Sequence, residues 1–435
     1  MSLPQTHTLA NEPLGSTVHR TVLPSGLRVV TEAIPSMRSA TLGAWAGVGS
    51  RDEPAVESGA SHFLEHLLFK GTEKRSAEEI SRVIEAVGGE SNAYTARDHT
   101  CYYERVLAED LPLAVDVLGD AVCGSRIAAD DVEVERGVIL EEIAASADDP
   151  AEQVFEHFNR ALFGDGGLGR DIAGTAESVR ALTAEQVRAF YDRHYVDSNL
   201  VVSVAGGIDH DETLKLVREA FAPMRPGPEV PPRRPSGPGY DVAAVDPEPL
   251  VVARDDTEQA HLVVGCRTMS RRDPRMYALG VLDNILGGGM SSRLFRIIRE
   301  ERGLAYTVRS GSAYFGETGL FSVYAGCSPD KSRRVRDLIL AEIERAATDG
   351  VGDEELRRGK KMYQVGVLMA AEDSGARMEW LGRDELLYGE LQTLERDLAR
   401  NEAVTSDDVR AVAADILSQP MTTAAVGPFD REEFA

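Results

Sequence analysis

Apolar and polar positions alternate along the chain with two periods, and the period indicates which segments are strands and which are helices. Extended segments rich in β-branched, aromatic or small apolar residues are predicted at 18–33 (a hairpin), 40–49, 90–95 and 100–106. Helices are predicted from a capping box at Ser76 to Val87, and over residues 111–122 and 130–145. Strands and helices are therefore mixed along the first half of the chain.

The pattern repeats after about 220 residues. A segment from Leu182 runs into an apolar strand ending at Gly206, and a similar segment from Val404 runs into a strand ending at Gly427. Between them, residues 223–239 contain seven prolines and are predicted to form a stiff, extended linker. The hypothesis is two homologous domains, at 1–222 and 240–435, joined by the 223–239 linker.

Composition narrows the classes of partner. The formal charge is −25, from 72 acidic and 47 basic residues, so the field repels nucleic acid and favours cationic ligands. The four cysteines show no C-x-x-C spacing, which fits a reducing compartment. No run of about 18 apolar residues occurs and the first residues lack signal-peptide features, so a soluble, cytoplasmic protein without a membrane partner is expected.

One short stretch combines residues that can bind a metal with residues that favour a helix. His62 and His66 are four apart, about 40° around a helix, so both can bind one ion, and Glu65 lies beside them. The order His-x-x-Glu-His is the inverted zincin pattern. Zinc suits two imidazoles, and a carboxylate outside the coordination shell can serve as a general base. The alternative, two histidines satisfied in a core, is less favoured because histidine is scarce in this chain.

A third ligand could come from the helix predicted over 130–145, which carries several acidic residues. Glu135 and Glu142 are seven apart and share a face, whereas Glu141 points about 100° away from Glu142. The alternative is that these acids form a solvated face. At the corresponding offset in the second half, residues 281–286 contain no histidine, so only one half is predicted to hold metal.

The second half offers two other candidate features. The glycines at 287–289 are followed by neither a Gly-Lys-Ser/Thr ending nor a G-x-G-x-x-G pattern, so a loop is favoured over a phosphate cradle. A helix is predicted over 292–302, and its Arg299 lies seven residues before Tyr306. Such a pair could donate to an oxyanion; the alternative is an exposed arginine and a packed tyrosine.

These motifs together resemble the pitrilysin or insulinase-type zinc peptidases, the inverzincins, in the short branch that includes mitochondrial processing peptidases and their bacterial relatives. The resemblance covers nearly the whole chain. It implies one zinc per chain, held by His62, His66 and Glu142, with Glu65 as the catalytic base. It also implies that Glu135 supports a ligand, that Asn92, Ala93 and Tyr94 lie along the substrate, and that Arg299 and Tyr306 complete the active site.

The resemblance further implies an α+β fold of two homologous domains, each a mostly antiparallel six-stranded sheet with packed helices, forming half of a clam-like chamber. Long members of that family carry four such domains on one chain, with zinc in the first and the Arg–Tyr pair in the fourth. A chain of 435 residues has room for two. A homodimer with sites completed across protomers is therefore expected.

The function expected from the sequence is a zinc-dependent endopeptidase acting on peptides or unfolded polypeptide segments, with a preference for cationic ones. One alternative is a noncatalytic structural subunit of a processing complex, which should have lost metal ligands, yet all are present. Another is a metal-dependent lyase of small thioethers, which should be much shorter and lack the second half.

Overall fold

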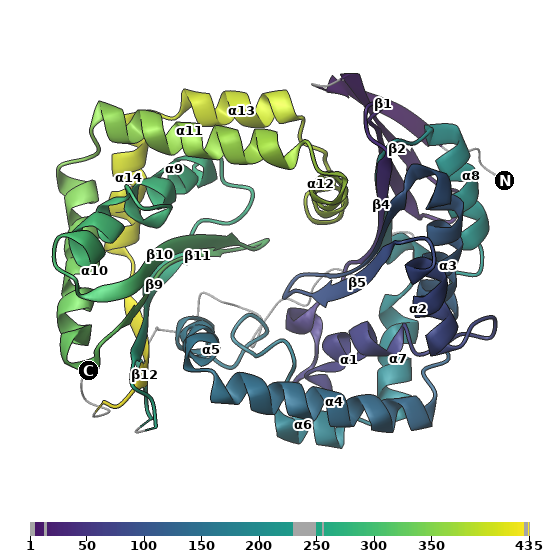
Figure 1. The fold of residues 1–435 in the computed structure, drawn as a ribbon, viewed down its shortest axis with the longest axis horizontal. Helices are drawn as coiled ribbons and strands as arrows, with labels where there is room; N and C mark the ends of the chain where they lie inside the picture. Colours follow the sequence, from purple (N-terminus) through teal and green to yellow (C-terminus); the bar gives the residue numbers. More distant parts are fainter. Residues whose placement is uncertain (1–4, 13–14, 229–248, 255, 430–433, 435) are drawn as a thin grey trace. The chain divides into compact units, whose positions relative to one another are not determined.

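The computed structural model describes residues 5–12, 15–228, 249–254, 256–429 and 434, and Figure 1 shows its elements. The chain divides into two compact units. Unit 1 comprises Met1–Ile143, Asp171–Ser236 and Leu368–Glu395, and unit 2 comprises Ala144–Arg170, Gly237–Val367 and Arg396–Ala435. Each unit packs helices on a sheet, which confirms the α+β class. The chain crosses between the units at five points of the sequence, and one of them, between residues 236 and 237, falls in the segment predicted to be a linker, most of which lies outside the described residues.

The sheet of unit 1 has seven strands in the order β1-β2-β3-β7-β4-β6-β5. Only β3 and β7 pair in parallel; the other neighbours are antiparallel. The segments predicted to be strands from their alternating or small apolar residues do form strands. Of these, β4 and β7 lie in the middle of the sheet and are buried on both faces. The bounds are β1 Gln5–Glu12, β2 Ser16–Val22, β3 Arg28–Ala33, β4 Ser39–Ala46, β5 Glu90–Thr95, β6 Thr100–Leu107 and β7 Leu200–Gly206.

The sheet of unit 2 repeats this topology. Its described strands have the order β10-β11-β9-β12-β8, which matches β5-β6-β4-β7-β3 position by position, and its one parallel pair, β12 with β8, matches β7 with β3. The internal repeat is therefore confirmed. The expected six strands per sheet are not found: β1 adds a seventh by pairing with β2, and five are described in unit 2. The bounds are β8 Leu250–Ala253, β9 Ala260–Thr268, β10 Ala305–Tyr314, β11 Gly319–Cys327 and β12 Thr422–Gly427.

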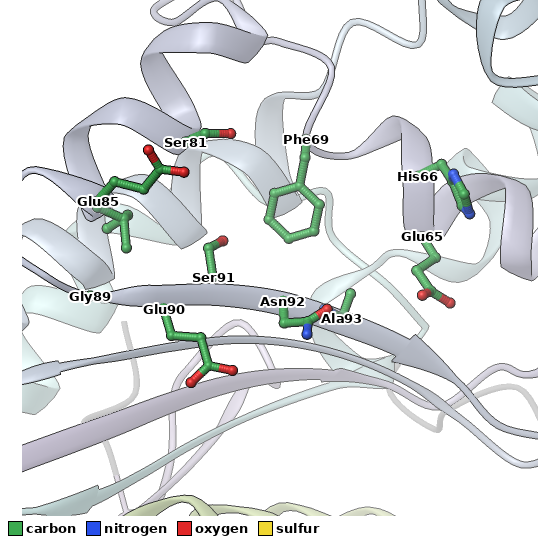
Figure 2. Close-up of a pocket in the computed structure, with 11 residues that line it drawn as sticks. Glu65, His66, Phe69, Ser81, Glu85, Gly89, Glu90, Ser91, Asn92 and Ala93 are labelled. Atoms are coloured by element: carbon green, nitrogen blue, oxygen red, sulfur yellow. The ribbon is translucent and has the colours of Figure 1, made fainter. Parts of the chain in front are cut away.

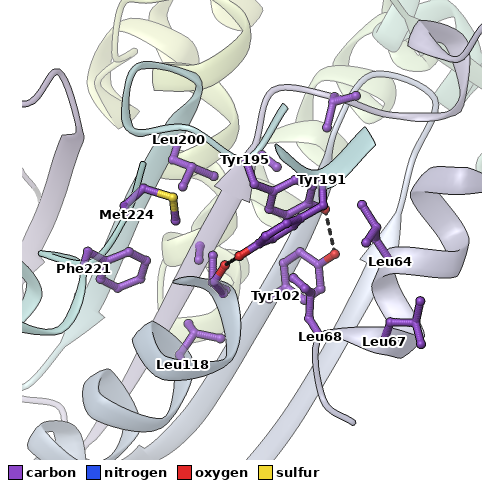
Figure 3. Packing of buried hydrophobic residues seen from close by; sticks show 14 of the residues in the cluster. Leu64, Leu67, Leu68, Tyr102, Leu118, Tyr191, Tyr195, Leu200, Phe221 and Met224 are labelled. Carbon is purple, nitrogen blue, oxygen red and sulfur yellow. Dashed lines mark hydrogen bonds between the residues drawn. The ribbon is translucent and has the colours of Figure 1, made fainter. Parts of the chain in front are cut away.

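The main core of unit 1 lies between one face of its sheet and amphipathic helices. Its polar atoms are paired: the Tyr102 and Tyr195 hydroxyls lie 2.7 Å apart, and the Tyr191 hydroxyl donates to the Val122 carbonyl at 2.7 Å (Figure 3). The capping box predicted at Ser76 opens α2. The helices from this half are α1 Ala60–Leu67, α2 Ala77–Glu85, α3 Leu111–Gly124, α4 Ala129–Asp148, α5 Pro150–Phe163, α6 Ala176–Ala181, α7 Ala184–His194 and α8 His210–Ala220.

The main core of unit 2 lies between its sheet and helices α9, α10 and α14. The helix predicted over 292–302 contains a π-helical turn over Phe295–Glu300, an irregularity that periodicity does not reveal. The helices from this half are α9 Met276–Gly287, α10 Ser332–Thr348, α11 Asp353–Ala370, α12 Ser374–Leu387, α13 Leu394–Ala403 and α14 Ser406–Ser418.

The two halves exchange one helix each. Helix α5, which follows α4, packs on β12 and β9 of unit 2, whereas its counterpart α12, which follows α11, packs on β4 and β7 of unit 1. Apolar side chains make both contacts: Phe158 and Val263 belong to one buried cluster, and Met378 and Trp45 belong to another. The units are consequently discontinuous in sequence, where continuous domains were expected, because the sheet that covers an apolar helix face need not be its own.

Buried ion pairs fix α12 to the sheet of unit 1. Arg377 donates to Glu32 at 2.7 Å, and both side chains are buried. Glu385, also buried, accepts two hydrogen bonds from Arg20 at 2.7 and 2.8 Å. The free-energy cost of desolvating buried charges is offset only when the charges are closely paired. The pairs therefore require α12 to keep this position on the sheet.

Within the described ranges, no helix combines the length and the apolar content that crossing a membrane requires.

Candidate metal centre

Helix α1 begins where a buried carboxylate caps it. Gly59, with a φ of 95°, precedes the helix, and a Cβ there would lie 2.7 Å from the Ala173 carbonyl oxygen, so only glycine fits. Glu53 accepts hydrogen bonds from the backbone N–H groups of Gly59 and Ser61, both at 2.7 Å. Two donors at the helix N-terminus are satisfied in this way, which fixes the start of the helix that carries the histidines.

Helix α4 is held against α1 by its other faces. Val132 and Ile139 are buried in the core of unit 1. The guanidinium of Arg136 lies 5.5 Å from the ring centroid of Phe63 on α1 and donates to the Val179 carbonyl. These contacts leave Glu142 on the helix face toward the histidines.

His62, His66 and Glu142 each place one ligand atom in a cluster whose members all lie within 4.8 Å of one another. The Glu142 Oε2 atom is 3.8 Å from His62 Nε2 and 3.5 Å from His66 Nε2. Zinc bonds of about 2.0–2.1 Å in a tetrahedron separate ligand atoms by roughly 3.3–3.4 Å. Glu142 is 48% exposed, which leaves room for small adjustment. The donor set and spacing therefore fit a zinc ion.

The protonation of His62 favours metal binding. Burial, followed by the nearby His66, lowers the pKa of His62 to about 4, although Glu142 acts in the opposite direction. The imidazole is therefore neutral at pH 7, the form that binds metal. Its Nδ1 atom is buried without a described hydrogen-bond partner, and its Nε2 atom faces Glu142.

Glu135 supports the other histidine. Its Oε2 atom lies 3.0 Å from His66 Nδ1, and its Oε1 atom lies 2.7 Å from Lys70 Nζ. The Glu135 side chain is only 2% exposed, so Lys70 supplies the charge that stabilises the buried carboxylate. A hydrogen bond at Nδ1 leaves Nε2 of His66 free to bind an ion, the usual arrangement behind a metal-bound histidine.

Glu65 lies beside these ligands without belonging to the cluster. With His66 it lines a cavity of about 490 Å³, whose other walls come from α2 and β5. Figure 2 shows Glu65 projecting from α1 toward the part of β5 that carries Asn92 and Ala93. A carboxylate there is placed to exchange a proton with a water or substrate next to the metal ligands.

The segment predicted to lie along the substrate is strand β5, at the edge of the sheet. Asn92 and Ala93 line the cavity. The Tyr94 ring lies on the other face of the sheet, 6.3 Å from the Trp45 ring, because neighbouring residues of a strand point to opposite sides. Tyr94 therefore offers its backbone, and not its side chain, to a strand added at this edge.

Arg299 and Tyr306 are brought together within unit 2. The Arg299 guanidinium lies 4.6 Å from the Tyr306 ring centroid and 4.7 Å from that of Phe295. Tyr306 is the second residue of the edge strand β10 and is 75% exposed, so the predicted alternative of a packed tyrosine is wrong. Both residues line a second cavity of about 450 Å³.

Sequence reasoning missed Lys70, Glu53 and the cavity walls. Lys70 lies four residues after His66, a spacing that could have drawn attention to it. Glu53 and the walls come from segments whose proximity only the fold reveals. The glycines at 287–289 end α9 and lead toward the π-helical turn, in keeping with the predicted loop.

Comparison with known families gives two adjoining matches. Residues 28–176 match the model of insulinase, peptidase family M16, and residues 181–363 match that of the peptidase M16 inactive domain. The first match contains His62, Glu65, His66, Glu135 and Glu142; the second contains Arg299 and Tyr306.

Relatives and solved structures extend the likeness to the whole chain. An uncharacterised zinc protease of Streptomyces coelicolor is 48% identical, over 98% of this chain and 93% of the length of that protein. An uncharacterised zinc protease of Bacillus subtilis is 32% identical, over 94% of this chain and 98% of the length of that protein. The crystal structure of a protease from Helicobacter pylori superposes with a TM-score of 0.87 at 22% identity, covering 98% of this chain and all of that one. The chain is thus similar over nearly its whole length to proteins named as zinc proteases, and it shares its fold with the protease from Helicobacter pylori.

Proposed function

Because the chain belongs to the insulinase family of M16 peptidases, we propose that it is a zinc-dependent endopeptidase that hydrolyses peptides or unfolded polypeptide segments. The observation that carries this proposal is the convergence of His62, His66 and Glu142, with Glu65 next to them on the wall of one cavity. The residue types match those of a hydrolytic zinc site, with three protein ligands and a free carboxylate.

Each of the named residues has a separate role in the proposed hydrolysis. A zinc ion bound by the three ligands supplies a Lewis acid for a peptide carbonyl and a water. Glu65 takes the proton of the attacking water and passes it to the leaving amine. Glu135 holds His66 in the tautomer that presents Nε2, and Lys70 holds Glu135. The open edge of β5 binds the substrate backbone with little demand on its sequence.

Activity itself is tested with a peptide library. The purified chain is incubated with the library with and without a chelator, and products are identified by mass spectrometry. Cleavage inside peptides, lost with chelator and restored by zinc, is the expected result. The alternative, a noncatalytic structural subunit, predicts no cleavage in any condition; the complete ligand set argues against it.

Glu142→Gln is expected to remove most of the bound zinc, because an amide is a weaker ligand than a carboxylate. Glu141→Gln is the matched control, since Glu141 is a neighbouring exposed acid outside the cluster. Zinc per chain is measured by elemental analysis after dialysis. Full occupancy in Glu142→Gln together with loss in Glu141→Gln would show that the ligand assignment is wrong.

We also propose that two copies of the chain form the working unit in the cytoplasm, and that Arg299 and Tyr306 of one protomer act on substrate bound by the other. The support is the family resemblance, the pairing of Arg299 with the exposed Tyr306, and four cysteines that are all free. The partner in this proposal is an identical chain.

Mixing inactive Glu65→Gln protomers with inactive Tyr306→Phe protomers tests the shared site. In a mixed dimer with shared sites, one site carries both lesions and the other carries none, so activity should rise above that of either pure variant. If each protomer used its own Tyr306, every site would carry one lesion. No recovery of activity, with subunit exchange verified by differently tagged chains, would contradict the proposal.

A further inference from the structure

The Tyr306 side chain projects from an irregularity in the edge strand of unit 2. The register of β10 with β11 shifts between Ala305 and Thr307, so Tyr306 is an extra residue in a β-bulge. A bulge re-aims the side chain that it carries, and here the exposed Tyr306 ring lies against the Arg299 guanidinium. Among the described strands β10 has only β11 as a neighbour, so backbone pairing holds it on one side alone.

Helix α9 holds the same strand through a side-chain clamp formed by Asp283, Ser310 and Ser312. Asp283 on α9 accepts hydrogen bonds from the hydroxyls of Ser310 and Ser312 on β10, the second at 3.2 Å. Burial raises the pKa of Asp283, although the serine hydroxyls act in the opposite direction by donating to the carboxylate. A Cβ at Gly287 would lie 2.3 Å from the Ser310 nitrogen, so the end of α9 touches the strand as well.

The clamp of unit 2 corresponds to an open cavity in unit 1. The matching topologies pair β10 with β5, and α9 and α1 each lie between the preceding strand of the sheet and that edge strand. In unit 1, Glu65 on α1 lines the 490 Å³ cavity together with Asn92 and Ala93 of β5. In unit 2, the acid on α9 bonds directly to β10. The corresponding helix therefore fastens the edge strand in unit 2, where it faces a cavity in unit 1.

We propose that Asp283 is a positioning residue for Tyr306, because it fixes the edge strand whose bulge presents Tyr306 to a substrate. Ser310 lies four residues after Tyr306, roughly 13 Å along a strand, and an edge strand paired on one side opens locally at low cost. Without the clamp, the Tyr306 ring would move more freely relative to Arg299, and a small misplacement of a group that contacts substrate lowers turnover. This inference rests on the proposed endopeptidase function and on the proposed role of Tyr306.

Peptide binding tests whether Asp283 acts through Tyr306. A fluorescent peptide is titrated onto zinc-loaded Glu65→Gln protein, alone and with Asp283→Ala, Tyr306→Ala or both added. Asp283→Ala is expected to raise the Kd about fivefold to tenfold when Tyr306 is present and less than about twofold when it is absent, because effects that pass through one residue are not additive. Asp283→Asn should recover most of the loss, since its amide oxygen still accepts a serine hydroxyl. In the active protein, Asp283→Ala should lower kcat/KM about tenfold with zinc content unchanged.

Asp408→Ala is the matched control in unit 2. Asp408 also accepts a hydroxyl, from Thr405 at 2.6 Å, but it caps α14 and has no bond to β10 among the described residues. Its loss removes a helix cap, so the urea midpoint should fall while the peptide Kd stays within about twofold. An effect on the Kd equal to that of Asp283→Ala would show that any loss of stability in this unit weakens binding, which would overturn the proposal.

Hydrogen exchange measured by mass spectrometry reports on the clamp without a substrate. Amides of β10 should exchange about tenfold faster in Asp283→Ala than in the wild type, and those of β5 should not change. Faster exchange in β10, together with no cleavage of any peptide by the wild type, would support the clamp and refute the proposed function. Unchanged exchange in β10, or equal effects of Asp283→Ala with and without Tyr306, would overturn the proposal. If Asp283→Ala does not fold, Ser310→Ala, which removes one of the two hydroxyls, replaces it in both measurements.

Discussion

Glu65→Gln is expected to lose nearly all peptide turnover while it keeps its zinc. The amide is nearly the same size as the carboxylate but cannot take a proton from the attacking water. Removal of a general base costs about 10² to 10⁴ in rate. Glu65 lies outside the cluster of ligand atoms, so zinc binding should not change. The measurement pairs kcat on a cleaved peptide with elemental analysis of the same sample.

Glu141→Gln is the control for this variant as well, because it removes one negative charge from the same region without touching the cavity wall. It should retain both zinc and turnover. Near wild-type activity in Glu65→Gln would contradict the role of Glu65 as general base. Loss of zinc in Glu65→Gln would instead mean that Glu65 is a ligand.

Arg377→Met is expected to destabilise unit 1 by about 3–5 kcal/mol, the typical cost of removing one partner of a buried ion pair. Among the described residues, Glu32 would keep only the hydrogen bond from Ser16, at 2.7 Å, for a carboxylate that is 2% exposed. Urea unfolding followed by tryptophan fluorescence measures this loss. Both tryptophans of the chain, Trp45 and Trp380, belong to unit 1, so the signal reports that unit.

The matched control is Arg105→Met on β6, which also removes an ion pair between the sheet of unit 1 and α12. Arg105 donates to Asp373 at 2.9 Å, but the two side chains are 44% and 42% exposed. Exposed pairs contribute about 0–1 kcal/mol, so the urea midpoint should hardly move. Equal shifts in the two variants would show that the Arg377–Glu32 pair does not anchor α12.

Much of the candidate site follows from local sequence. The spacing of His62 and His66 places both on one helix face, and the spacing of Glu135 and Glu142 does the same on α4. The family resemblance links these two segments. Helix periodicity alone could not select Glu142 over the other acids of α4, because all of them are polar positions on a partly solvated helix.

Other features could not be predicted from the sequence because they depend on which helices, strands and loops contact one another in the fold. The apolar face of α5, with Val154, Phe158 and Leu162, would suit either sheet, and nothing in its pattern specifies unit 2. The cap that Glu53 gives to α1 joins residues in separate turns. The orientation of Tyr94 depends on the strand register, which a single short strand leaves open.

The reciprocal exchange of α5 and α12 has a consequence for synthesis on the ribosome. All strands of the unit 1 sheet have been made once Gly206 is added, and the metal ligands are complete at Glu142. The helix that covers the second face of that sheet ends at Leu387. At about 5–20 residues per second, the intervening stretch takes roughly 10–40 s to translate. During that interval the nascent chain carries an uncovered apolar face around Trp45, which makes it a substrate for chaperones.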